Sequence, residues 1–89
     1  MMKRRRLRAV NGYMIQRTIV NGERGVKIIY LINGVFFTQS KYPVDIDNET
    51  QEKIQEKLEE LIEMNRNAED MYTAVPLTTI VSEVEKIIV

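Results

Sequence analysis

The sequence contains no cysteine, no histidine and no tryptophan. Without cysteine, the chain can form neither disulfides nor thiolate metal sites, as is typical of proteins in a reducing compartment. The absence of histidine removes the commonest metal ligand and the usual general base near neutral pH. We therefore expect a protein that is not an enzyme and that binds no metal and no cofactor.

Long hydrophobic runs are also missing. The basic start, KRRRLRAVNGYMIQR, never enters an apolar stretch of the length that a secretion signal needs, and no later segment is apolar enough to span a membrane. These features predict a cytoplasmic protein.

The chain has 89 residues, of which 44% are hydrophobic and 29% charged, a globular composition. A domain of this size buries a small core, and such domains are commonly supplemented by disulfides, metals or a second subunit. Because the first two are excluded here, we expect a homo-oligomer, most simply a dimer.

The net charge of zero is the sum of a basic first half and an acidic second half. Residues 1–41 carry nine lysines and arginines against Glu23 alone, a net charge of +8. Residues 42–89 carry four basic against twelve acidic side chains, a net charge of −8. The two halves either neutralise each other, within one chain or between two subunits, or face different partners.

Three Asn-Gly pairs divide the basic half, at Asn11-Gly12, Asn21-Gly22 and Asn33-Gly34. Asn-Gly is the strongest short signal for a β-hairpin, because both residues tolerate the positive φ of a type I′ turn. The segments around these pairs are rich in β-branched and aromatic residues, which favour strands. The predicted strands are Arg5–Val10, Tyr13–Val20, Val26–Ile32 and Val35–Ser40.

The strand VKIIYLI predicts that both faces of this sheet need a cover. Val26, Ile28 and Tyr30 would point to one face, and Ile29 and Leu31 to the other. We expect Tyr30, together with Phe36 and Phe37 of the next strand, to belong to the core. Either one helix covers each face, or both helices cover one face and a second subunit covers the other.

A helical pattern begins after KYPVDID. Ile54, Leu58, Leu61 and Ile62 share one helix face, and this spacing predicts an acidic amphipathic helix over residues 48–66. Asn48 with Gln51 resembles a capping box, and Asp47 is the alternative N-cap.

Residues 78–88 are predicted as a second helix capped by Thr78 or Thr79. Their apolar side chains recur at helical spacing, although TTIV and IIV are also compatible with a strand. The predicted fold is therefore α+β in one domain over residues 1–89: a basic four-stranded antiparallel meander (1–41), a long acidic amphipathic helix and a short C-terminal helix.

Two groups of charged side chains are candidate binding sites. The first is basic and suits phosphate or another anion, by ion pairing and by arginine stacking on bases; it consists of Lys3, Arg4, Arg5, Arg6, Arg8 and Arg17. If residues 4–10 form an edge strand, alternate arginines share one face, where Arg17 would extend them into a basic ridge. The basic residues also have simpler roles, as a solvated terminus or as protection of an edge strand.

The second group is a row of carboxylates on the long helix, suited to a basic partner protein; it consists of Glu52, Glu56, Glu59 and Glu63. A solvated helix face is the commoner explanation of such a row. Asp45, Asp47 and Glu49 alternate as in a calcium loop, but Thr50 occupies the sixth position, where that loop needs glycine. Helix capping explains these carboxylates better.

The segment GYMIQRTIVNGERGVKIIYLINGVFFTQS resembles the arm-type DNA-binding domains of phage-like integrases, in which a three-stranded sheet lies in a DNA groove with one helix behind it. The resemblance is one of strand lengths and covers about half of the chain. It implies nucleic-acid binding, but the segment departs from that pattern where basic residues are expected: Lys27 is followed by Ile28, Ile29, Tyr30 and Leu31.

From these patterns we expect a small regulatory or inhibitory protein-binding module, of a composition that suits a phage or mobile element. The alternative is a nucleic-acid-binding regulator that acts through its basic N-terminal strand. A third possibility is an arginine-lined interface between subunits that captures a small phosphorylated ligand.

Overall fold

The computed structural model describes residues 7–89, which form a three-stranded antiparallel sheet followed by two helices. The elements are β1 (Gly12–Val20), β2 (Glu23–Ile32), β3 (Val35–Tyr42), α1 (Asn48–Asn67) and α2 (Leu77–Ile88). The predicted α+β class and both predicted helices are confirmed. The number of strands among the described residues is three, where the sequence pattern predicted four.

The two hairpins follow the predicted turn chemistry. At both turns the Asn and the Gly adopt positive φ, with 52° at Asn21 and Asn33 and 81° at Gly22 and Gly34. A type I′ turn needs this left-handed backbone at both central residues, and Asn-Gly accommodates it with little strain. β2 is therefore the central strand, with β1 and β3 as its two antiparallel neighbours.

The predicted first strand, Arg5–Val10, is wrong over residues 7–10, which are not in a strand; residues 5 and 6 lie outside the described residues. Asn11-Gly12 does not reverse the chain, because Asn11 already donates its backbone N–H to the Leu31 carbonyl at 3.0 Å. Its side chain also bonds the backbone N–H and the side chain of Asn33, at 2.9 Å each. Asn11 thus fastens the start of β1 to the β2–β3 turn.

Ahead of Asn11, the chain leaves the sheet and packs against α1. Ala9 and Val10 are buried. The Asn65 side-chain amide donates to the Val10 carbonyl at 2.7 Å and to the Val75 carbonyl at 3.1 Å, and its oxygen accepts from the Val75 N–H at 2.6 Å. One buried polar side chain therefore joins the segment before β1 to the segment before α2.

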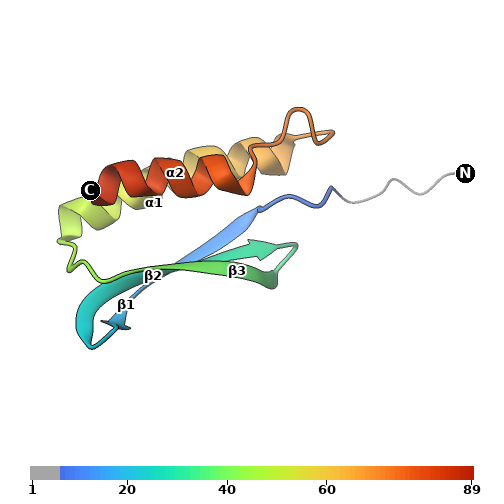
Figure 1. The fold of residues 1–89 in the computed structure, drawn as a ribbon. Helices are drawn as coiled ribbons and strands as arrows, with labels where there is room; N and C mark the ends of the chain where they lie inside the picture. The colour runs from blue at the N-terminus through green and yellow to red at the C-terminus, as the bar shows by residue number, and fades with distance from the viewer. Residues whose placement is uncertain (1–6) are drawn as a thin grey trace, which may run out of the picture.

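Both helices lie on the same side of the sheet, side by side and running in opposite directions (Figure 1). The core lies between the sheet and the two helices. Its fully buried side chains come from one face of β2, from α1 and from α2: Val26, Ile28, Tyr30, Ile54, Leu58, Ile62, Ile80 and Val84. Of the two arrangements that the sequence left open, the chain thus adopts the one in which a single face is covered by helices.

The helix ends differ from one another. Asp47 is the N-cap of α1, and its carboxylate accepts from the Thr50 N–H at 2.7 Å. Of the two predicted caps, the structure therefore uses Asp47 and not Asn48. α2 begins after Pro76 with no side-chain cap, so the predicted caps at Thr78 and Thr79 are wrong. Within residues 7–89, neither helix is long and apolar enough to cross a bilayer.

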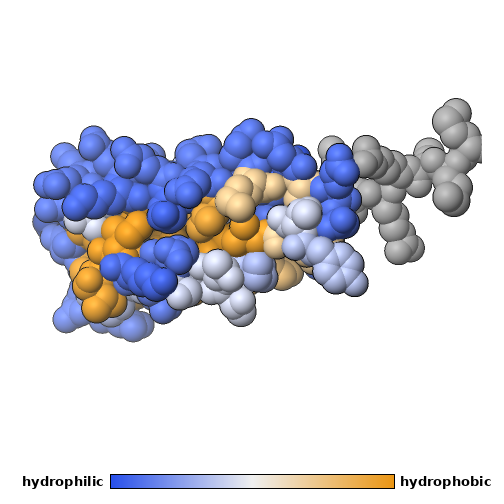
Figure 2. All heavy atoms as spheres, turned by 90° about the horizontal axis from the view of Figure 1, so that it is seen from above, coloured by the Kyte–Doolittle hydropathy of each residue, from blue (hydrophilic) through white to orange (hydrophobic). Residues whose placement is uncertain are grey.

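The side of the two helices that points away from the sheet has a hydrophilic part and a hydrophobic part. Figure 2, which views the molecule from the helix side, shows a hydrophilic band along one long edge and a hydrophobic strip beside it. The hydrophilic band agrees with the exposed glutamates of α1. The apolar residues of α2 that are only partly buried, such as Val81 and Ile88, agree with the hydrophobic strip.

Candidate functional site

The face of the sheet that points away from the helices carries a cluster of apolar side chains. Successive residues of a strand point to opposite faces, so the residues between the buried Val26, Ile28 and Tyr30 of β2 must point outward. Together with their cross-strand neighbours on β1 and β3, they form what we call the uncovered face; its apolar members are Met14, Ile29, Leu31 and Phe36. No element among the described residues covers it.

The side chains of this cluster are in register with one another. Ile29 pairs with Met14 on β1, and Leu31 pairs with Phe36 on β3. Met14 is 47% exposed and Phe36 57% exposed, while the two β2 residues between them are half-buried. The expectation that Phe36 and Phe37 belong to the core is therefore wrong, since Phe37 is also 40% exposed. In this fold, Phe36 lies on the uncovered face, and Phe37 lies at the sheet margin beside the start of α2.

The other half of the uncovered face is polar and basic. Lys27 of β2 lies directly opposite Lys41 of β3 and Gln16 of β1. Two like charges on facing positions of adjacent strands destabilise a sheet, and no carboxylate lies within ion-pair distance of either lysine in residues 7–89. The uncovered face therefore combines an apolar cluster with unneutralised positive charge.

The sheet and the helices differ in ion pairing. All five ion pairs among the described residues use cations of the helices, namely Lys53, Lys57, Arg66 and Lys86. None of the basic side chains between residue 7 and α1 takes part in an ion pair with another described residue; these are Arg8, Arg17, Arg24, Lys27 and Lys41. The described cations of the sheet and of the segment before it thus have no carboxylate partner within residues 7–89.

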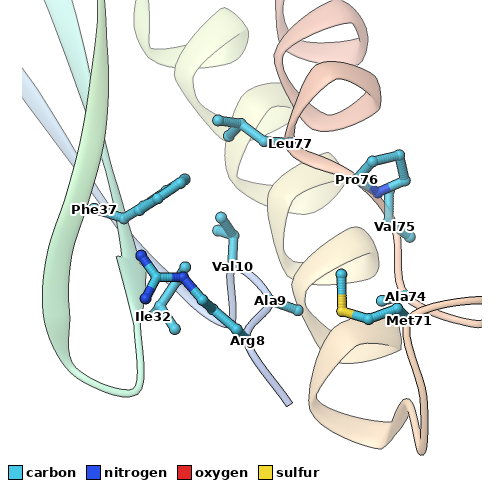
Figure 3. Close-up of a pocket in the computed structure, with 10 residues that line it drawn as sticks. All are labelled: Arg8, Ala9, Val10, Ile32, Phe37, Met71, Ala74, Val75, Pro76 and Leu77. Atoms are coloured by element: carbon cyan, nitrogen blue, oxygen red, sulfur yellow. The ribbon is translucent and has the colours of Figure 1, made fainter.

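A second apolar feature is a groove between the start of β3 and the start of α2. It encloses about 270 Å³ and is lined by Arg8, Ala9, Val10, Ile32, Phe37, Met71, Ala74, Val75, Pro76 and Leu77. Figure 3 shows Phe37 and Ile32 on the sheet side and Leu77 and Pro76 on the helix side. The Arg8 guanidinium lies 5.7 Å from the centre of the Phe37 ring, within the range of a cation–π contact. Arg8 is the one charged residue of this lining.

Of the predicted basic residues, the structure describes Arg8 and Arg17, and it places these two far apart. Lys3, Arg4, Arg5 and Arg6 lie outside the described residues. Arg8 lies beside Ile32 at one end of β2, whereas Arg17 pairs with Val26 near the other end, and about 20 Å of strand separates Ile32 from Val26. Arg17 instead lines a shallow hollow with Arg24 and Asp45. Arg8 and Arg17 therefore do not lie side by side as the predicted ridge requires, and its other members, Arg4 and Arg6, lie outside the described residues.

The predicted acidic row is exposed along α1, but half of it is already engaged. Glu59 accepts a hydrogen bond from the Tyr13 hydroxyl at 2.8 Å and lies 3.7 Å from Arg66, which also pairs with Glu63 at 3.3 Å. Glu52 and Glu56 have no cation within ion-pair distance in residues 7–89. The contact between Tyr13 and Glu59 places the acidic row beside β1, on the side of the sheet away from β3.

The titratable groups of the described residues do not form an obvious reactive centre. No group of three or more acidic side chains in residues 7–89 is placed to hold a metal ion, and Asp47 has its pKa lowered by the hydrogen bonds it accepts from Thr50 as a helix cap. Burial raises the pKa of Tyr30 to about 12, and burial with the Glu59 hydrogen bond raises that of Tyr13 to about 12. Such hydroxyls are poor proton donors and weak nucleophiles near neutral pH.

Comparison of the chain with protein-family models, with curated proteins and with solved structures finds no match. The candidate sites therefore depend on the residues and the geometry of this chain alone.

The sequence pattern indicated that β2 is apolar on both faces, and this was the signal for the uncovered face. It did not show which side the helices take, nor that Phe36 would stand opposite Leu31. The groove had no sequence signal, because its lining residues come from three segments that are distant in the chain.

Proposed function

We propose that the protein is a non-enzymatic, protein-binding regulatory module, and that the uncovered face of the sheet is its binding surface. The observation that carries this proposal is the apolar cluster of exposed Met14 and Phe36 with half-buried Ile29 and Leu31, which are paired as Met14 with Ile29 and Leu31 with Phe36. Exposed apolar patches with a polar rim are typical of protein interaction sites. A protein partner would bury these side chains and gain the hydrophobic free energy that the fold leaves unused.

Charge indicates the chemistry of that partner. The charged residues flanking the cluster on this face are Lys27 and Lys41, so a partner that presents apolar side chains beside carboxylates would be complementary. A second copy of this chain would supply its carboxylates from α1, where Arg66 and Tyr13 already engage two of the four glutamates of the acidic row. We therefore favour a different protein, and a homodimer is an outcome that the experiment must be able to detect.

Nucleic acid fits the geometry less well. Binding to a phosphate backbone needs several cations along one path, whereas Arg8 and Arg17 lie at opposite ends of the sheet and the centre of the uncovered face is apolar. The acidic row of α1 is a weaker candidate surface for a protein, since Arg66 and Tyr13 already engage two of its four glutamates.

Two matched substitutions test the proposal. Met14 and Met64 are 47% and 50% exposed, but Met14 lies on the uncovered face and Met64 on α1. We expect a partner that is captured by the wild-type protein, and that binds it directly when purified, to bind Met64→Glu with unchanged affinity. Met14→Glu should weaken that binding at least tenfold, while circular dichroism shows both variants folded.

Three outcomes would contradict the proposal. Equal binding by the two variants would place the partner elsewhere. Nucleic acid that shifts in a mobility assay, with a steep salt dependence, would favour the alternative function. A dimer in analytical ultracentrifugation that Met14→Glu dissociates would show that the uncovered face serves self-association.

A further inference from the structure

The outer edge of β3 is open and poorly protected. The sheet order is β1-β2-β3, and no backbone group of β3 bonds to any segment other than β2 in residues 7–89. Proteins usually protect such an edge with charged residues, prolines or a short strand. β3 has eight residues, and its first six, VFFTQS, include neither a charge nor a proline. This edge can accept a further strand.

Apolar surface lies on both sides of that edge. On one side is the uncovered face, with Phe36 as its member nearest the edge. On the other side is the groove, where the Phe37 ring faces the start of α2 (Figure 3). This follows from the register shift after Tyr30, which places Phe36 opposite Leu31 and leaves Phe37 as an additional residue of β3.

A strand added along β3 would use both surfaces. Its side chains would alternate between the two faces of the sheet, so that one set would extend the apolar cluster and the other would enter the groove. The groove volume of about 270 Å³ is sufficient for one or two apolar side chains. This is the geometry of β-strand addition, in which main-chain hydrogen bonds provide affinity and alternate pockets provide specificity.

The charges beside this edge indicate which side chains an added strand would carry. Arg8 lies at the groove and Lys41 near the end of β3, and neither has a carboxylate within ion-pair distance among the described residues. A β3 strand from a second copy would bring another Lys41 and no carboxylate. We propose that the occupant is an extended, acidic and otherwise apolar segment of another protein, which pairs with β3 as a fourth strand of the sheet.

This inference rests on the proposed function and specifies its binding mode. The probe is a blocked octapeptide, Glu-Val-Val-Val-Thr-Val-Val-Glu, and the control peptide has Lys at both ends. Hydrogen exchange followed by NMR should show slower exchange for amides of Val35–Tyr42 when the acidic peptide is added. Amides on the edge of β1, Gly12–Val20, should exchange at an unchanged rate, and the lysine peptide should have no effect.

Charge reversal provides the matched variants. Arg8 and Arg24 are both exposed, lie at opposite ends of the sheet and have no carboxylate within ion-pair distance among residues 7–89. Arg8→Glu should weaken binding of the acidic peptide at least tenfold and allow the lysine peptide to bind. Arg24→Glu, with the same change of net charge, should bind the acidic peptide within twofold of wild type.

The possible failures can be told apart. If the partner needs Met14 but neither it nor the peptide protects the β3 amides, this inference is wrong and the proposed function stands. If the peptide protects β3 but no partner depends on Met14, the strand addition stands and the proposed surface is wrong. If β3 becomes protected without peptide as protein concentration rises, with doubling of the mass, the occupant is a second copy and the inference is overturned.

Discussion

The two faces of β2 have nearly the same composition and opposite environments. Val26, Ile28 and Tyr30 are fully buried under the helices, whereas Ile29 and Leu31, which alternate with them, lie on the uncovered face. Neighbouring residues of β2 thus lie alternately in the core and on a face that no described element covers. Hydrophobicity alone therefore does not identify the core of this domain.

The difference arises from where the helices pack. α1 and α2 contact each other and share one side of the sheet, so their apolar faces supply a single cover (Figure 1). A three-stranded sheet has two faces, and no element within residues 7–89 covers the second. We infer that the apolar residues of the uncovered face are available for binding, while those of the covered face maintain the fold.

Substitution of neighbouring isoleucines should test this comparison most strongly. Ile28→Ala should lower the free energy of unfolding by about 3 kcal/mol, because it leaves a cavity among fully buried side chains. Ile29→Ala should lower it by no more than about 1 kcal/mol, since Ile29 is half-buried and has no layer above it. Urea denaturation of both variants measures the difference. Equal losses would show that the second face is covered in solution.

The next largest effect should come from Asn65, which stabilises the covered side. Asn65→Ala removes three hydrogen bonds and leaves a buried carbonyl of Val10 and partly buried backbone groups of Val75 without these partners. We expect a loss of about 2 kcal/mol in unfolding free energy. Asn67→Ala is the control, because its amide makes one long contact with Glu63 at 3.5 Å. A loss of the same size in the control would contradict this role of Asn65.

Substitution of Tyr30 tests whether its buried hydroxyl has a hydrogen-bond partner such as water. The Tyr30 hydroxyl is buried and makes no hydrogen bond of good geometry within residues 7–89, although the nearby Ser40 hydroxyl partly offsets the rise of its pKa. Tyr30→Phe should therefore leave the unfolding free energy unchanged or raise it by up to about 1 kcal/mol. Thermal and urea denaturation provide the measurement. A clear loss of stability would indicate that the hydroxyl does have a partner, such as a buried water molecule.

The smallest expected change in unfolding free energy comes from substitution of Tyr13, the residue of β1 that contacts the acidic row. Tyr13→Phe removes the exposed hydrogen bond to Glu59 and should cost about 0.5 kcal/mol at pH 7. The pKa of Tyr13 is raised to about 12 in the folded protein, so above pH 10, the ordinary tyrosine value, the unfolded chain ionises first.

The contribution of Tyr13 is therefore complete below about pH 10 and is lost as pH rises toward 12. The stability advantage of wild type over Tyr13→Phe, measured by urea denaturation, should shrink over that interval. An advantage that grows above pH 10 would contradict the sign of this pKa change.

Local signals in the sequence were sufficient for most of the secondary structure. The positive φ at Asn21-Gly22 and Asn33-Gly34 and the helical spacing of Ile54, Leu58 and Ile62 each depend on residues close in the chain. Asn11-Gly12 was mispredicted because its partners, Leu31 and Asn33, are about twenty residues away. Without those contacts, the pair looks like the other two turns.

The sequence by itself determined that β2 has two apolar faces, that the charges are divided between two halves, and that one helix presents a row of glutamates. Only the tertiary structure decided which face is buried, that Arg8 and Arg17 lie apart, and that Phe37 faces a groove beside an open edge. The physical reason is that periodicity specifies the faces of one element, whereas the packing of distant elements decides which of those faces meet.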